Sequence, residues 1–146
     1  MPGQFSTDQF ADGQFRSHGH YELHLEDGIF VGIATGPFNV ECLAAISKAR
    51  KAALADWKDG APVNAITVFK SNMLMSPQAL DAYSRGLEQD FKNISPLAAF
   101  AWVVGPDVEG RGLMMEHFTE IFERSQIQWR VFETLAHAKA WIASKR

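Results

Sequence analysis

The sequence predicts an α/β fold: a mixed five-stranded sheet in the order β-β-α-β-α-β-α-β-α, with helices on both faces. Three observations lead to this prediction. Asp27-Gly28, a pair typical of a hairpin turn, joins two strand-like segments. Three further strand-like segments each lead into an amphipathic stretch. One of them, 97–104, is apolar throughout, as expected for a parallel strand covered on both faces.

The chain begins its folded part with a hairpin. Residues 21–26 alternate apolar and polar side chains, which indicates a half-exposed strand, and we expect this strand to be the antiparallel edge of the sheet. Residues 29–34 form the returning strand, and Gly36-Pro37 ends it. The later strands are predicted at 63–69, 97–104 and 128–132.

Local signals place the four helices. Asn39 is a good N-cap for a helix that extends to about Trp57, with Lys48, Arg50, Lys51 and Lys58 on its polar faces. Ser76 and then Pro77 are the expected residues at the start of the second helix. The third helix is predicted from about 109 to 125 and the fourth over 135–142.

Composition limits the class of protein. A chain of 146 residues is one domain by length, with 1–19 as a polar and aromatic leader and 20–146 as the α/β domain. The net charge is −3 without a basic stripe, so we expect no nucleic-acid partner. The single cysteine, Cys42, forms no internal disulfide, which favours a cytoplasmic location. No apolar run approaches the roughly 18 residues of a membrane span, and no signal peptide is recognisable.

The leader repeats the pair Gln-Phe three times, ending at Phe5, Phe10 and Phe15. A spacing of five residues fits neither a strand nor a helix. The segment is either a mobile extension or a docking arm on a second copy of the chain. The second reading predicts a structural homodimer.

Several local phrases resemble the SpoIIAA-like, or STAS, family. They are 33–39 leading into the first helix, 68–70 leading to Ser76-Pro77, and 131–133 leading into the last helix. Together with the element order, the resemblance spans roughly residues 21–144 and is greatest to small stand-alone bacterial SpoIIAA-like proteins. Their shape has been compared with the lipid-binding lobe of the CRAL-TRIO domain. The resemblance implies this fold and a binding or regulatory role.

The family's anti-sigma-factor antagonists carry a phosphorylated serine in an Asp-Ser-Ser-Gly phrase. In this sequence Ser76-Pro77-Gln78-Ala79 stands in that place. The phosphoacceptor serine is absent, and the Ser76 hydroxyl is expected to cap a helix. This departure argues against a phospho-switched antagonist.

The loop after strand 63–69 is the predicted ligand site. It follows the carboxyl end of a strand and precedes a helix N-terminus, where free N–H groups attract anions. Its methionines offer an adaptable apolar surface. The alternative is an ordinary loop whose methionines pack into the core. Candidate ligand-binding residues are Lys70, Ser71, Asn72, Met73, Met75, Ser76, Gln78 and, from the glycine-rich loop after strand 97–104, Arg111.

Other chemistry has weaker support. His18, His20 and His24 share one face of an extended segment but lack a fourth ligand, so we expect no metal and no cofactor. Cys42 lies near a helix N-terminus, which can activate a thiol, although no histidine is placed beside it by the sequence. No Gly-x-Ser-x-Gly motif is present.

We therefore predict a non-enzymatic binding or regulatory module for a small amphipathic or anionic ligand or a protein partner. The alternatives are a small hydrolase or transferase that uses Cys42, and a structural homodimer without a ligand.

Overall fold

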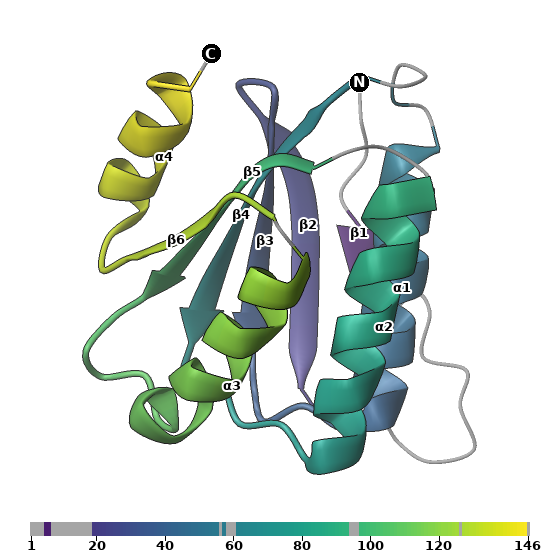
Figure 1. Ribbon diagram of the computed structural model, residues 1–146, viewed down its shortest axis with the longest axis vertical. Helices are drawn as coiled ribbons and strands as arrows, with labels where there is room; N and C mark the ends of the chain where they lie inside the picture. Colours follow the sequence, from purple (N-terminus) through teal and green to yellow (C-terminus); the bar gives the residue numbers. More distant parts are fainter. Residues whose placement is uncertain are drawn as a thin grey trace.

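A computed structural model describes residues 5–6, 19–55, 57, 61–93, 97–125 and 127–145, with the backbone alone at 90–93 and 97–98. The described part of the chain is α/β, with a six-stranded mixed sheet and four helices (Figure 1). The strands are β1 (Phe5–Ser6), β2 (His20–Glu26), β3 (Ile29–Thr35), β4 (Val63–Lys70), β5 (Leu97–Val104) and β6 (Trp129–Phe132). The helices are α1 (Val40–Leu54), α2 (Pro77–Asn93), α3 (Arg111–Ser125) and α4 (Leu135–Ala143).

The strands lie in the sheet in the same order as in the sequence, from β1 to β6. The pairs β1–β2 and β2–β3 are antiparallel, whereas β3, β4, β5 and β6 run parallel. The β2–β3 turn is the predicted one: Asp27 has φ 54° and Gly28 has φ 77°, the positive values of a tight hairpin turn.

The sequence predicted five strands, one fewer than the described sheet contains. Five strands lie where the sequence predicts them, and a sixth, β1, comes from the segment interpreted as a leader. Phe5 pairs with Leu23 and Ser6 with Glu22, so β2 is not the edge of the sheet. β1 is only two residues long, so it shows no alternation of apolar and polar side chains by which a strand could be predicted. Its strand conformation comes from pairing with β2. Phe10, Phe15 and His18 lie outside the described residues.

The helices are divided unequally between the two faces of the sheet. The larger core combines one face of the sheet with buried residues of α1, α2 and α3. The smaller core lies on the other face and contains Ala138 and Ile142 of α4. Figure 1 accordingly shows α4 apart from the other three helices. The expectation of helices on both faces is confirmed, in a three-to-one division.

This division follows from the strand order. Three right-handed crossovers that all step in one direction place their helices on one face of the sheet. β5 contacts α4 on one face, and its Trp102 packs against Phe118 of α3 on the other, so the strand is buried on both faces, as its apolar sequence predicts. The side chains of Phe100 and Trp102 point into the larger core, and those of Ala101 and Val103 into or against the smaller one.

The predicted helix starts are confirmed where a side chain caps them. Asn39 accepts a hydrogen bond from the Cys42 N–H at 2.9 Å, and Ser76 accepts one from the Ala79 N–H at 3.1 Å. Each bond satisfies a backbone donor that has no partner inside the helix. α1 ends at Leu54, about one turn earlier than predicted, and Lys58 lies outside the described residues.

Candidate functional site

The predicted ligand loop begins with a sharp turn. The Asn72 N–H donates to the Lys70 carbonyl at 2.8 Å, and Ser71 between them has φ 68°. This is the geometry of a γ-turn, which is uncommon for a residue other than glycine. A backbone held in this region is maintained by the contacts around it.

Backbone hydrogen bonds join the loop to the segment that follows β3 and to the segment that follows β5. The Gly36 N–H donates to the Asn72 carbonyl at 3.0 Å, and the Glu109 N–H donates to the Ser71 carbonyl at 2.9 Å. The Met73 N–H donates in turn to the Glu109 carbonyl at 3.0 Å. A Cβ on Gly36 would lie 2.5 Å from the Asn72 carbonyl oxygen, so this approach requires glycine. The loop therefore extends the sheet.

The predicted site residues do not converge. Met73 is fully buried in the core, and Asn72 and Met75 are half-buried. Lys70 and Gln78 are exposed. Ser71 and Ser76 are also exposed, and the Ser76 oxygen is occupied in capping α2. The alternative reading, methionines packed in the core, holds for Met73.

The strand order removes one reason for placing a ligand here. Open parallel sheets bind ligands where the strand order reverses and neighbouring helices diverge to opposite faces. Between β3 and β6 of the described sheet there is no such reversal. The carboxyl end of β4 is covered by the joined segments around 36–38, 72–75 and 109.

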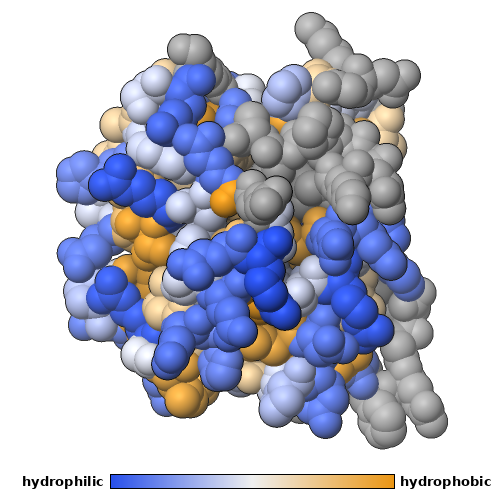
Figure 2. Space-filling model, in the orientation of Figure 1, coloured by the Kyte–Doolittle hydropathy of each residue, from blue (hydrophilic) through white to orange (hydrophobic). Residues whose placement is uncertain are grey.

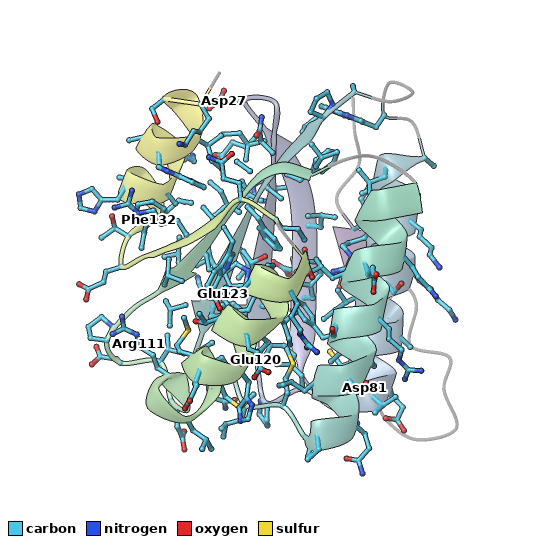
Figure 3. All side chains as sticks on the ribbon, viewed as in Figure 1. Asp27, Asp81, Arg111, Glu120, Glu123 and Phe132 are labelled. Atoms are coloured by element: carbon cyan, nitrogen blue, oxygen red, sulfur yellow. The ribbon has the colours of Figure 1, made fainter. Side chains whose placement is uncertain are left out.

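Arg111 lies in a different hollow from the Met73–Gln78 segment. The hollow is formed by the β5–α3 loop, the start of α3 and the end of β6, and it is lined by Pro106, Val108, Gly110, Arg111, Gly112, Met115, Val131, Phe132 and Glu133. Figure 3 shows Arg111 at the start of α3, on the far side of that helix from Asp81 of α2. Arg111 is half-buried and lines this open hollow, whereas it lines neither the crevice nor the groove described below.

A site that the sequence did not predict lies inside the larger core. A narrow crevice runs between the sheet and helices α1 and α2. All four residues of β4 that face this side, Val63, Ala65, Thr67 and Phe69, line it, so it follows the length of that strand. Met75 closes one end. The space open to water-sized spheres is ≈ 40 Å³. About 10–15 Å³ holds one water molecule, so the crevice is large enough for several atoms.

Four polar side chains line this mainly apolar crevice: Tyr21, Arg50, Thr67 and Tyr83. The Tyr21 ring lies over Gly32, and a Cβ there would be 2.6 Å from the Tyr21 Cζ. Gly32 pairs with Thr67, so the Tyr21 hydroxyl lies beside the Thr67 position. Arg50 approaches from α1 and lies against Gly86 of α2, one turn from Tyr83.

Burial raises the pKa of both phenols that line the crevice. Desolvation raises the pKa of Tyr21 to about 12, although the Arg50 charge acts in the opposite direction. Burial also raises the pKa of Tyr83, by a larger amount. Both hydroxyls are neutral at physiological pH, as a tyrosine with the ordinary pKa of about 10 also is, and burial extends this neutral range to higher pH.

The position of Arg50 corrects a prediction. We expected its side chain on a polar face of α1, but it is only 8% exposed. Cys42, Ile46, Arg50 and Leu54 follow one another at intervals of four residues, and all four are buried. That spacing places Arg50 on the apolar stripe of α1. The burial of Arg50 could therefore have been predicted from the sequence by this spacing.

A second surface feature is an open groove between α2 and α3. Its walls include Leu80, Met114, Ile121 and the exposed Leu113, with Asp81, Glu120 and Arg124 at its border. Figure 2 shows hydrophobic surface between these helices, with hydrophilic side chains on both sides. Met75 lines both this groove and the crevice, so it is the point at which the two are closest.

The remaining candidate residues for catalysis or metal binding are Cys42, His20 and His24, and their contacts are those of structural residues. Cys42 is fully buried in the first turn of α1, which is typical of an inert thiol. His20 contacts Glu22 at 3.1 Å, and His24 contacts Glu26 at 3.8 Å. Within the described ranges, no group of three or more His, Cys, Asp or Glu side chains is placed to hold a metal ion.

Comparisons with known proteins give no relative. No family model, no curated protein and no solved structure matches the chain. Among the described helices, none combines the length and apolar character that crossing a membrane requires.

Proposed function

We propose that this chain is a non-enzymatic binding or regulatory module for a small amphipathic or anionic ligand. The observation that carries the proposal is the crevice between the sheet and helices α1 and α2, which has apolar walls around four polar side chains. Ligand sites are commonly of this kind: mostly apolar, with a few polar groups that fix the orientation of the ligand.

The burial of the polar groups supports the proposal. Thr67 is 8% exposed and Tyr83 is 7% exposed. In the described part of the chain, no hydrogen bond involves the hydroxyl of either residue. Neither hydroxyl oxygen is among the fully buried polar atoms without a partner in the described residues, so each oxygen remains accessible from the crevice, where water or a ligand can bind it.

The proposal moves the ligand away from the loop that the sequence indicated. Of the loop residues, only Met75 lines the crevice. A thioether at one end of a cavity adapts to the shape of a ligand, because its unbranched side chain has several rotatable bonds. A SpoIIAA-like, or STAS-type, relationship remains part of the proposal, supported by the sequence phrases and by the α/β class of the fold.

Native mass spectrometry of the purified protein, before and after denaturation, tests the proposal. We expect a mass excess that disappears on denaturation. In Met75→Ser the bound fraction should fall, because the end of the crevice is changed. Leu113→Ser is the matched control: Leu113 lines the groove but not the crevice, so the bound fraction should stay the same.

A clean mass in the native spectrum, with no small molecule recovered from the denatured protein, would contradict a bound ligand. The protein-partner form of the proposal would then remain, with the groove between α2 and α3 as its surface. A hydrolase or transferase that uses Cys42 is disfavoured by the burial of this residue. Rapid reaction of the native thiol with a thiol reagent at neutral pH would reverse that judgement.

A further inference from the structure

The hollow at the ends of β5 and β6 lies where two helices diverge. α3 follows β5 and packs on the face of the larger core, whereas α4 follows β6 and packs on the opposite face. Figure 1 shows the two connections leaving the same end of the sheet in different directions. The strand order does not reverse here, but diverging helices still leave a gap at the carboxyl ends of two adjacent parallel strands. Open α/β sheets bind ligands in gaps of this kind.

The hollow is large enough for a small molecule. The space open to water-sized spheres is ≈ 870 Å³, whereas that of the crevice is ≈ 40 Å³. Small-molecule sites commonly measure about 300–1,000 Å³. Gly112 lines the hollow beside Arg111, and a Cβ at Gly112 would meet no atom within 4 Å. The space next to the start of α3 is therefore open to a ligand.

The lining has a charged end and an apolar end. Arg111 and Met115 lie one turn apart on α3, and both line the hollow. From β6 the hollow is lined by Val131 and by Glu133, which directly follows the strand. α3 begins at the carboxyl ends of the strands and runs back along them, as the helix of a crossover does. Arg111 therefore lies at the same end of the hollow as Glu133, and Met115 at the same end as Val131.

The two charged side chains of the hollow are available to a ligand. Among the described residues, neither Arg111 nor Glu133 has a hydrogen bond or an ion pair, so they are not paired with each other. The Arg111 guanidinium can donate two parallel hydrogen bonds to a carboxylate, and the Glu133 carboxylate can accept from an ammonium group. The charged end thus complements a head group that carries both charges.

The apolar side chains complement the rest of such a ligand. Val108, Met115 and Val131 are half-buried and pack against the larger core, and each also lines the hollow. Phe132 lines it from the opposite face of the sheet, where its ring contacts Trp141. An aliphatic group in the hollow would remove apolar surface of these side chains from water. The thioether of Met115 can adapt to the shape of that group.

We infer that the hollow binds an aliphatic α-amino acid. The carboxylate binds Arg111, the ammonium group binds Glu133, and the side chain lies between Met115 and Val131. An α-amino acid joins both charges to one carbon atom and continues in an apolar chain, as the two ends of this lining require. The site is independent of the proposed function, because the hollow and the crevice share no lining residue.

Calorimetric titration of the full chain with leucine tests the inference. Two analogues each lack one charge: isocaproate has no ammonium group, and isoamylamine has no carboxylate. We expect each analogue to bind about tenfold more weakly than leucine, since each loses its hydrogen bonds to one charged side chain.

Two substitutions assign the charges separately. Arg111→Gln should lower the affinity for leucine about tenfold and should not lower that for isoamylamine. Glu133→Gln should lower the affinity for leucine by a similar factor and should not lower that for isocaproate. Glu116→Gln is the matched control: Glu116 is exposed on α3 and does not line the hollow, so leucine affinity should stay the same.

The contrary outcomes are equally specific. No leucine binding at millimolar concentration, or equal binding of leucine and both analogues, overturns the inference. Unchanged leucine affinity in either Arg111→Gln or Glu133→Gln also overturns it. Met75→Ser changes the crevice alone of these two sites, so a loss of leucine binding in this variant would overturn the assignment to the hollow. Thermal unfolding of each variant shows that a lost affinity is not a lost fold.

Discussion

At the scale of single residues, the space above Gly32 shapes the interior of the protein. This glycine makes no turn and lies in the middle of β3, where any residue fits the backbone. Its lack of a Cβ leaves room for the Tyr21 ring, which brings a hydroxyl over the centre of the sheet. One missing methyl group thus positions a polar atom in the crevice.

Gly32→Ala should lower the free energy of unfolding by about 1–3 kcal/mol, because the new methyl group overlaps the Tyr21 ring and overpacks the core. Chemical denaturation measures the change. Gly105→Ala is the control: a Cβ at Gly105 would meet no atom within 4 Å, so a change within about 0.5 kcal/mol is expected. Equal effects of the two substitutions would contradict the packing role of Gly32.

The two tyrosines of the sequence allow a direct test of burial. Near-ultraviolet absorbance should show little phenolate in the native protein at pH 11, with only about a tenth of Tyr21 ionised, since the pKa of Tyr21 is about 12 and that of Tyr83 is raised further. The unfolded chain should ionise near the ordinary value of about 10. A folded-state pKa above the unfolded one means that stability is full below pH 10 and falls above it. Native ionisation near pH 10 would contradict the burial of both rings.

Features that depend on residues close together in the sequence could be predicted from it. Features that depend on contacts between distant segments could not. The caps at Asn39 and Ser76, the hairpin turn and the apolar β5 depend on residues close in sequence, and all are confirmed. β1 was missed because two residues become a strand only by pairing with β2. The crevice was missed because Thr67 and Tyr83 come together only when α2 covers the sheet.

Two glycines near the start of α3 should respond oppositely to alanine. Gly112→Ala should raise the free energy of unfolding by about 0.4–1 kcal/mol, because its Cβ would enter open space and alanine favours the helix. Gly110→Ala should lower it by about 1–2 kcal/mol, since φ is +83° and the Cβ would lie 2.5 Å from Leu74 Cδ2. Chemical denaturation of both variants gives the comparison, and the same sign of change in both would contradict this local geometry.

At the scale of the whole molecule, one ion pair links the first hairpin to the helix on the opposite face from α1–α3. Lys139 Nζ of α4 lies 2.9 Å from Glu26 Oε2 of β2. The hydrogen bond from Lys139 is the main cause that lowers the pKa of Glu26, and the nearby His24 contributes less. α4 is thereby attached to the antiparallel part of the sheet as well as to the parallel part beneath it.

Lys139→Met should destabilise the protein at pH 7 and have little electrostatic effect at pH 3. A depressed folded-state pKa contributes stability above the unfolded value of 4.5, and this contribution is lost as the pH falls through the folded-state value. Urea unfolding of both proteins at the two pH values measures the difference. Lys70→Met, at an exposed lysine for which the described part of the chain holds no ion pair, is the control. A difference as large at pH 3 as at pH 7 would show that lost packing, rather than charge, is responsible.

The strand order also governs how the chain can assemble during synthesis. Each strand of the sheet pairs with the one made just before it, so the growing chain can add strands without waiting for a distant partner. The face that carries Val31, Ile66 and Ala101 is different, because α4 covers it and follows every strand in the sequence. A nascent chain that has completed β6 therefore still presents this apolar face to water and to chaperones, until residues 135–143 leave the ribosome.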